Sequence, residues 1–150
     1  MNNTVWIGNE VVNGKAVLTD VDAFGEHIAE DMLADNGWSN FKYIKNASDN
    51  GIDIIGTGPK GQLGFFEVKT STTGVINNLS SRQQYMNEFV EDVLTKAKNA
   101  EFPYQNIDEC IRSDASQTLD KYYGNPYNVS GNVIGVDIEE GEIYISRWER

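Results

Sequence analysis

The chain has 150 residues, of which 39% are hydrophobic and 11% aromatic, so it can bury one core and is not of the disordered class. Its formal net charge of -11 argues against broad, nonspecific binding to a polyanion, because nucleic-acid proteins usually gain affinity from Lys and Arg. No apolar run is long enough for a transmembrane helix, and the first residues lack a signal-peptide pattern. We therefore expect a soluble single domain over residues 1–150.

The first predicted elements are a short hairpin and a helix. Residues 4–19 have the pattern of an irregular or hairpin segment around Asn13-Gly14, a favoured turn dipeptide. Over residues 22–36 the apolar side chains recur with helical spacing, and Gly37 follows where a C-terminal cap belongs. This spacing predicts a helix over 22–36.

Three short strands are predicted next. Residues 41–44 alternate as a strand, and a turn over 46–51 leads into the apolar segment 52–55. A glycine-rich loop then joins 52–55 to a second apolar segment, 63–68. These two segments should pair as a hairpin.

The second half of the chain predicts helices and then strands. A long helix should begin at Ser80, with weaker helical signals over 105–123, and the strands 133–138 and 142–146 should flank a turn. The order of helix, strands, helices and strands predicts one α/β unit. The face of the long helix that packs on the sheet should carry Tyr85, Met86, Phe89, Val90, Val93, Leu94 and Ala97.

Two reactive residue types occur once each. Cys110 has no second cysteine, no zinc-ligand spacing and no evident base beside it, so we interpret it as a buried helical thiol rather than a nucleophile. His27 follows Glu26 on the predicted helix and should point about 100° away from it. We interpret His27 as a structural or surface residue.

Two charged residues project from one face of the otherwise apolar strand 63–68 and its extension. Side chains alternate along a strand, so Glu67 and Lys69 share a face and Val68 points to the other. If the hairpin is symmetric about Lys60, Asp53 lies opposite Glu67, with the two Cβ atoms about 5 Å apart. Such a carboxylate pair is repulsive alone but suits a shared Mg²⁺ or Mn²⁺ ion. The alternative is an exposed salt-bridge cluster, which the apolar neighbours disfavour.

The segments Gly51-Ile-Asp53 and Phe65-Phe-Glu-Val-Lys69, with the helix before them, resemble the PD-(D/E)xK phosphodiesterase superfamily over about residues 22–98. The proline of that motif is replaced here by Ile52. The resemblance implies a restriction-endonuclease-like mixed central sheet flanked by helices. It also implies a divalent metal held by Asp53 and Glu67, with Lys69 as the catalytic ammonium.

The resemblance extends to flanking residues. Such nucleases often add a glutamate from the first helix, which we assign to Glu26 in preference to Glu30 one turn later. The alternative is that both are solvated helix charges. A polar residue after the catalytic strand often lies near the site, which suggests Arg82, Gln83 and Thr70 as substrate contacts. Gln83 also fits a capping box with Ser80, and capping is the preferred interpretation for it.

The pattern also loosely resembles the C-terminal nuclease domains of bacterial polymorphic and contact-dependent growth inhibition toxins. This implies cleavage of DNA or tRNA in the cytoplasm of a target bacterium after delivery within a larger secreted protein. It further implies a cognate immunity protein as partner. Two alternatives stay open: a cellular restriction- or repair-type endonuclease, and a non-catalytic acidic inhibitor or immunity-type protein with its 23 Asp and Glu residues.

Overall fold

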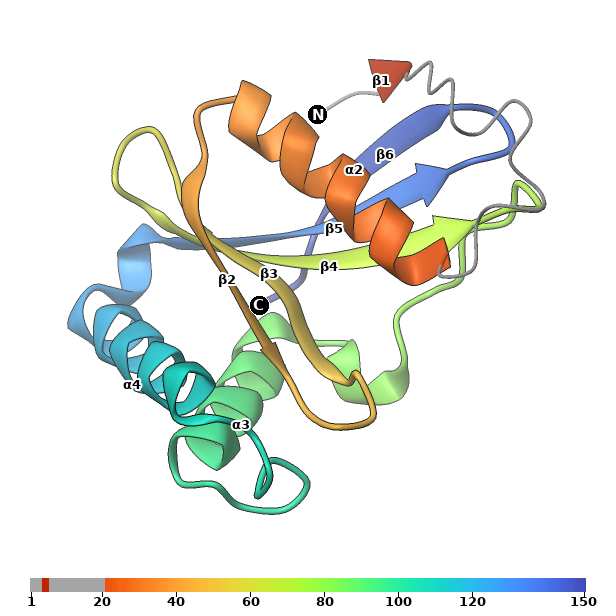
Figure 1. Cartoon of the computed structure of the whole chain (residues 1–150). Helices are drawn as coiled ribbons and strands as arrows, with labels where there is room; N and C mark the ends of the chain where they lie inside the picture. The colour runs from red at the N-terminus through yellow and green to blue at the C-terminus, as the bar shows by residue number, and fades with distance from the viewer. Residues whose placement is uncertain (1–3, 6–20) are drawn as a thin grey trace.

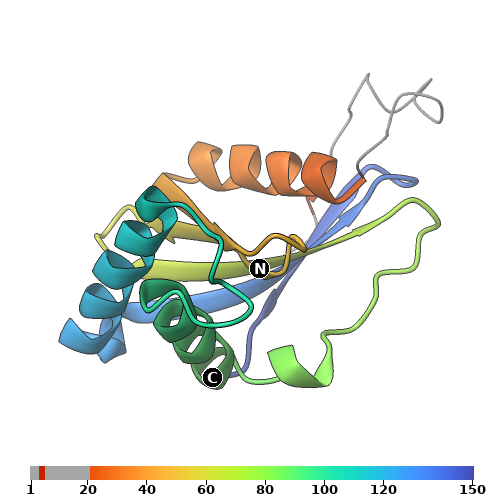
Figure 2. The same ribbon diagram turned by 60° about the horizontal axis from the view of Figure 1, so that its bottom comes forward.

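The computed structural model describes residues 4–5 and 21–150, which form a mixed six-stranded sheet between helices (Figure 1). The strand order is β1-β6-β5-β4-β3-β2, and α2 lies on one face of the sheet while α3 and α4 lie on the other (Figure 2). The predicted α/β domain with a mixed sheet flanked by helices is confirmed. The strands are β1 (Thr4–Val5), β2 (Ser39–Lys45), β3 (Gly51–Thr57), β4 (Leu63–Ser71), β5 (Val129–Asp137) and β6 (Glu142–Arg147). The helices are α2 (Val21–Asp35), α3 (Met86–Lys98) and α4 (Glu109–Gly124), with 3-10 turns at Ser81–Gln83 and Pro126–Asn128.

Two apolar layers fix the sheet between the helices. One layer joins α2 to the side chains that alternate on its face of the sheet, among them Ile54 and Phe66. The other joins α3 and α4 to the opposite face, where Ile55 and Phe65 lie. Because Asp53 and Glu67 are two residues from Ile55 and Phe65 along their strands, their side chains belong to the α3 and α4 face.

The predicted hairpin and its register are confirmed. β3 and β4 are antiparallel, and Gly56 pairs with Gly64, as symmetry about Lys60 requires. β4 then pairs in parallel with β5 along nine residues, and β5 pairs antiparallel with β6. The single parallel pair makes the sheet mixed, because residues 72–128 cross over between β4 and β5.

The first helix agrees with its predicted span. The buried residues of α2 recur at intervals of four and three positions, and Gly37 adopts a φ of +88° just after the helix, a conformation that favours glycine. Of the predicted 4–19 segment, residues 4–5 form β1 beside β6. The proposed turn at Asn13-Gly14 lies outside the described residues.

The prediction that the long helix begins at Ser80 is wrong. Residues 81–83 form a 3-10 turn, and α3 begins only at Met86. The peptide groups between the 3-10 turn and α3 form hydrogen bonds with the C-terminal segment instead. Trp148 Nε1 donates to the carbonyl of Gln83 at 2.7 Å, and Met86 N donates to the carbonyl of Glu149 at 2.6 Å. Tyr85 therefore stays extended and is 53% exposed, so it does not belong to the buried face.

The interpretation of Cys110 as a buried thiol is also wrong. Cys110 lies on α4, as expected, but its side chain is exposed. The buried face of this helix runs through Ala115, Thr118, Leu119 and Tyr122, with Ile111 packed at its edge. Cys110 precedes Ile111 by one position, about 100° round the helix, and so lies off that face.

Gly25→Ala is expected to destabilise the protein, because α2 packs on β4 there without room for a methyl group. A Cβ at Gly25 would lie 1.8 Å from Thr70 Oγ1 and 2.8 Å from Thr70 Cβ. The free energy of unfolding should fall by about 1–3 kcal/mol, although alanine favours a helix by about 1 kcal/mol. Gly124→Ala is the control, because a Cβ there meets nothing within 4 Å. Equal urea midpoints for Gly25→Ala and the parent would contradict this packing.

No helix within residues 4–5 and 21–150 combines the length and the apolar character needed to cross a membrane.

Candidate metal and catalytic centre

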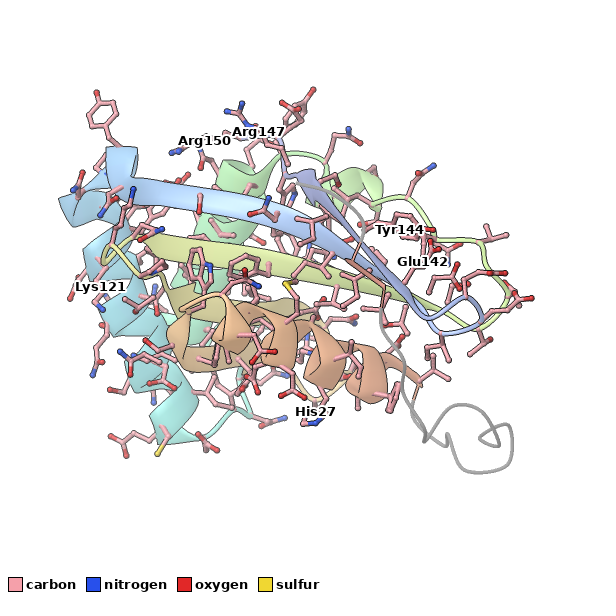
Figure 3. All side chains as sticks on the ribbon, turned by 90° about the horizontal axis from the view of Figure 1, so that it is seen from above. His27, Lys121, Glu142, Tyr144, Arg147 and Arg150 are labelled. Carbon is pink, nitrogen blue, oxygen red and sulfur yellow. The ribbon has the colours of Figure 1, made fainter. Side chains whose placement is uncertain are left out.

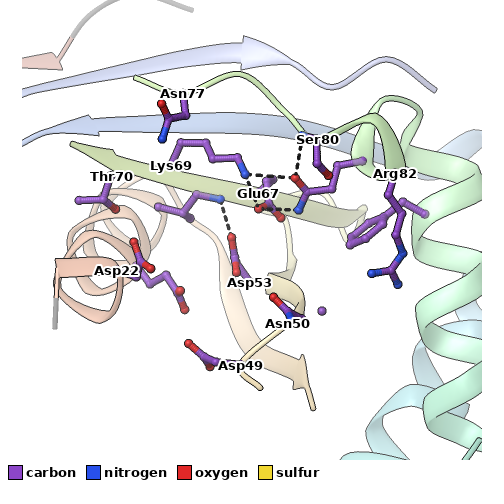
Figure 4. Close-up of a pocket in the computed structure, with 15 residues that line it drawn as sticks. Asp22, Asp49, Asn50, Asp53, Glu67, Lys69, Thr70, Asn77, Ser80 and Arg82 are labelled. Carbon is purple, nitrogen blue, oxygen red and sulfur yellow. Dashed lines mark hydrogen bonds and ion pairs between the residues drawn. The ribbon is translucent and has the colours of Figure 1, made fainter. Parts of the chain in front are cut away.

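A cavity of about 420 Å³ opens where the start of α2, the β2–β3 turn and the second half of β4 meet (Figure 4). All seven residues proposed for the site from the sequence line this cavity. Carboxylates outnumber cationic side chains among the lining residues by five to two, so the cavity favours a bound cation. It is lined by Asp22, Glu26, Asp49, Asn50, Gly51, Asp53, Glu67, Val68, Lys69, Thr70, Asn77, Ser80, Arg82, Gln83 and Phe89.

Asp53 and Glu67 are buried carboxylates at the back of the cavity. They are only 8% and 4% exposed, which excludes the alternative of an exposed salt-bridge cluster. Asp53 Oδ2 accepts a hydrogen bond from the backbone N–H of Val68 at 2.8 Å. The pairing of β3 with β4 ends at Ile54 and Phe66. The hydrogen bond between Asp53 and Val68 links the two strands just beyond that point.

Glu67 is in an environment that disfavours its charge. Burial and the neighbouring charge of Asp53 raise its pKa to about 8, against the opposing effect of Lys69. Gln83 Nε2 donates to Glu67 Oε1 at 2.9 Å, whereas Oε2 is buried without a hydrogen-bond partner. With this pKa the Glu67 carboxyl retains its proton near neutral pH, and a divalent cation would replace that proton on the buried oxygens.

Lys69 lies beside Glu67 on the same face of β4, as predicted. Its Nζ is 3.5 Å from Glu67 Oε1 and donates to Gln83 Oε1 at 3.1 Å. Ser80 N also donates to Gln83 Oε1, at 3.3 Å. Gln83 therefore takes part in the predicted capping box and also contacts both charged residues of β4, whereas its contact with substrate stays a prediction.

Glu26 reaches the cavity from α2, and Glu30 does not. Glu26 lines the cavity, whereas Glu30 accepts a hydrogen bond from Tyr43 outside it. Burial raises the pKa of Glu26, and its hydrogen bond from Lys45 opposes this increase. The preference for Glu26 as the residue near the site agrees with the structure.

Lys45 was not predicted, yet it has the shortest ionic contacts near the cavity. Its Nζ is 2.6 Å from both carboxylate oxygens of Glu26 and 3.3 Å from Asp53 Oδ1. Burial alone would lower its pKa, but the hydrogen bond to Glu26 and the charge of Asp53 raise it overall. The strand over 41–44 was predicted one residue too short to include Lys45, which pairs with Gly51 two residues before Asp53.

Arg82, Thr70 and His27 differ from one another in their exposure and in their contacts. Arg82 is 52% exposed, with Nη2 3.5 Å from Asp92 Oδ2 and its guanidinium over the Phe89 ring. Thr70 Oγ1 is buried without a partner, close against Gly25. His27 is exposed on the outer side of α2 and 3.4 Å from Asp31, in agreement with a surface role (Figure 3).

The donor set fits a hard divalent cation at Asp53 and Glu67. Both are oxygen ligands, they adjoin each other, and Glu67 Oε2 lacks a partner. Within the described residues, however, no three His, Cys, Asp or Glu side chains are already gathered as a ligand set. Glu26, a third carboxylate of the cavity, is instead held by Lys45.

Comparison of the chain with models of protein families and with curated proteins finds no match to either.

Proposed function

We propose that this protein is a metal-dependent nuclease of the PD-(D/E)xK type, hydrolysing phosphodiester bonds of DNA or tRNA. The observation that carries the proposal is the meeting of Asp53, Glu67 and Lys69 in one cavity, with Glu67 Oε2 buried and unpaired. A sheet gains no stability from two adjoining buried carboxylates, so the arrangement has the character of a functional site.

Asp53 and Glu67 are the residues that would hold Mg²⁺ or Mn²⁺. Hard carboxylate oxygens suit these ions, and the raised pKa of Glu67 means that binding should release a proton near neutral pH. When bound, the cation would polarise the phosphoryl group and neutralise charge that develops on it.

The chain's own residues have separate tasks in this proposal. Hydrolysis joins a water oxygen to phosphorus and breaks one P–O ester bond, whose oxygen leaves as a hydroxyl after taking a proton. Lys69, 3.5 Å from Glu67 Oε1, would orient the water or stabilise the developing negative charge. Gln83 holds Glu67 and Lys69 in position through its amide. Glu26 adds charge on the α2 side.

Substrate contacts are assigned to the outer part of the cavity. Arg82 is half-exposed there and can approach a phosphate, although Asp92 competes for it. Thr70 lines the cavity and is half-buried, with its Oγ1 buried close against Gly25. With five carboxylates in the lining, a bound cation is needed before a polyanion can approach closely.

The first test is cleavage itself. Plasmid DNA and total tRNA are incubated with the protein in Mg²⁺ or Mn²⁺, and we expect cleavage of at least one that disappears in EDTA. Asp53→Ala should abolish cleavage, since it removes a metal ligand. The proposal fails if the parent cuts equally well in EDTA, or if neither nucleic acid is cut with either metal.

We further propose that the nuclease acts as a toxin domain in the cytoplasm of a target bacterium and is neutralised by a cognate immunity protein. The support is the resemblance around Glu26 and the segment 67–70 to such toxins. Production of the chain inside a bacterium without the partner should stop growth, and Asp53→Ala should not. Normal growth with a protein that cleaves in vitro would favour the cellular restriction- or repair-type endonuclease.

The non-catalytic alternative is supported by the net charge of -11, which would suit an acidic inhibitor that imitates nucleic acid. Such a protein has no need of Lys69 beside a buried Glu67. It would bind a basic partner protein without cleaving plasmid or tRNA at any metal concentration.

A further inference from the structure

Lys45 is placed as a cation among carboxylates from three different segments. Its Nζ contacts Glu26 of α2 at 2.6 Å, Asp53 of β3 at 3.3 Å and Asp49 of the β2–β3 turn at 3.8 Å. The Lys45 side chain is only 16% exposed.

The contacts of Lys45 are distinct from those of Lys69. Lys69 contacts Glu67 and Gln83 (Figure 4). Lys45 engages both oxygens of Glu26, so that carboxylate has no oxygen free of a charged partner. Asp53 thus has two chemically different neighbours, the Lys45 ammonium and the Glu67 carboxyl.

We propose that the Lys45 ammonium takes the place of a second metal ion beside Asp53. It thereby limits the centre to a single divalent ion, held by Asp53 and Glu67. The inference rests on the proposed function, because it presumes that this pair binds a metal. Glu26, Asp49 and Asp53 could otherwise offer carboxylates to a second ion. A second divalent ion there would be repelled by the ammonium and would have to displace it from Glu26.

Lys45 is accordingly a positioning residue rather than a catalytic one. It supplies a positive charge on the α2 side of Asp53 whether or not metal is present. It also links Glu26 of α2 to Asp53 of β3. Removing the ammonium while keeping its apolar chain should free Glu26 as a ligand and leave Asp53 without the neighbouring positive charge.

The experiment counts bound Mn²⁺ by equilibrium dialysis of the full chain at about pH 8. The parent should bind one Mn²⁺. Lys45→Met should bind two, with the first bound about tenfold more tightly, as removal of a neighbouring cation predicts. Lys45→Arg, which keeps a cation, should again bind one. Lys42→Met is the matched control, because Lys42 lies on the same strand but contacts Gln117 and Asp114 of α4.

The outcomes separate this inference from the proposed function. No Mn²⁺ on the parent would remove the metal site and with it the proposed function. One Mn²⁺ on the parent and one, with unchanged affinity, on Lys45→Met would overturn only the inference, as would two ions on the parent. If Lys45→Met is unfolded without metal, Mn²⁺ should refold it by replacing the ammonium; a variant that stays unfolded in Mn²⁺ contradicts the proposal.

Discussion

Glu67→Gln is expected to stabilise the metal-free protein at alkaline pH and to abolish metal-dependent cleavage. Gln keeps the size of the side chain but cannot ionise, so the variant avoids a buried charge beside Asp53. Loss of the ligand should lower turnover by about 10³ or more, on the scale of groups that act directly on the transition state. Stability and activity should therefore change in opposite directions, as expected of a functional site.

The pH dependence follows from the direction of the Glu67 shift. Its pKa rises from an ordinary 4.5 to about 8 on folding. Between these values the folded chain retains a proton that the unfolded chain loses, so the metal-free protein should lose stability as pH rises from about 4.5 to 8. Above that range this contribution is constant. Mg²⁺ should offset the loss, because it binds the ionised carboxylate of the folded chain.

Urea unfolding in EDTA at several pH values, repeated with Mg²⁺, measures both effects. In Glu67→Gln most of the loss of stability with rising pH should disappear. A smaller loss should remain because the pKa of Glu26 is also raised. Glu140→Gln, an exposed residue in the β5–β6 turn, is the control and should follow the parent. A parent whose stability without metal does not fall between about pH 5 and 8 would contradict the assigned burial of Glu67.

Lys69→Met is expected to lower turnover by about 10² or more while the protein stays folded. The variant keeps the apolar stem and removes the ammonium beside Glu67 Oε1. Because the charge of Lys69 lowers the pKa of Glu67, the pH range over which the variant binds metal should also shift upward.

Turnover must be compared at equal metal occupancy, so each variant is assayed at several Mg²⁺ concentrations and at two pH values. Lys60→Met, at the exposed tip of the β3–β4 hairpin, is the control and should cleave like the parent. If Lys69→Met is as fast as the parent once metal is saturating, Lys69 has no part in the chemistry and acts only on the affinity for metal.

The sequence alone determined the centre of the site because its geometry is local. Apolar residues on either side of a glycine-rich turn set the β3–β4 register, and the alternation of side chains placed Glu67 and Lys69 on one face. These inferences need only the period of each element and one tight turn.

Only the tertiary structure decided where distant segments meet. The contact of Lys45 with Glu26 depends on how far β2 extends and on how α2 crosses the sheet, and neither has a local sequence signal. The late start of α3 depends on hydrogen bonds from the C-terminal segment at Trp148 and Glu149. The exposure of Cys110 likewise depends on which face of α4 packs against α3. Pairings between residues far apart in the chain result from packing, which no local pattern encodes.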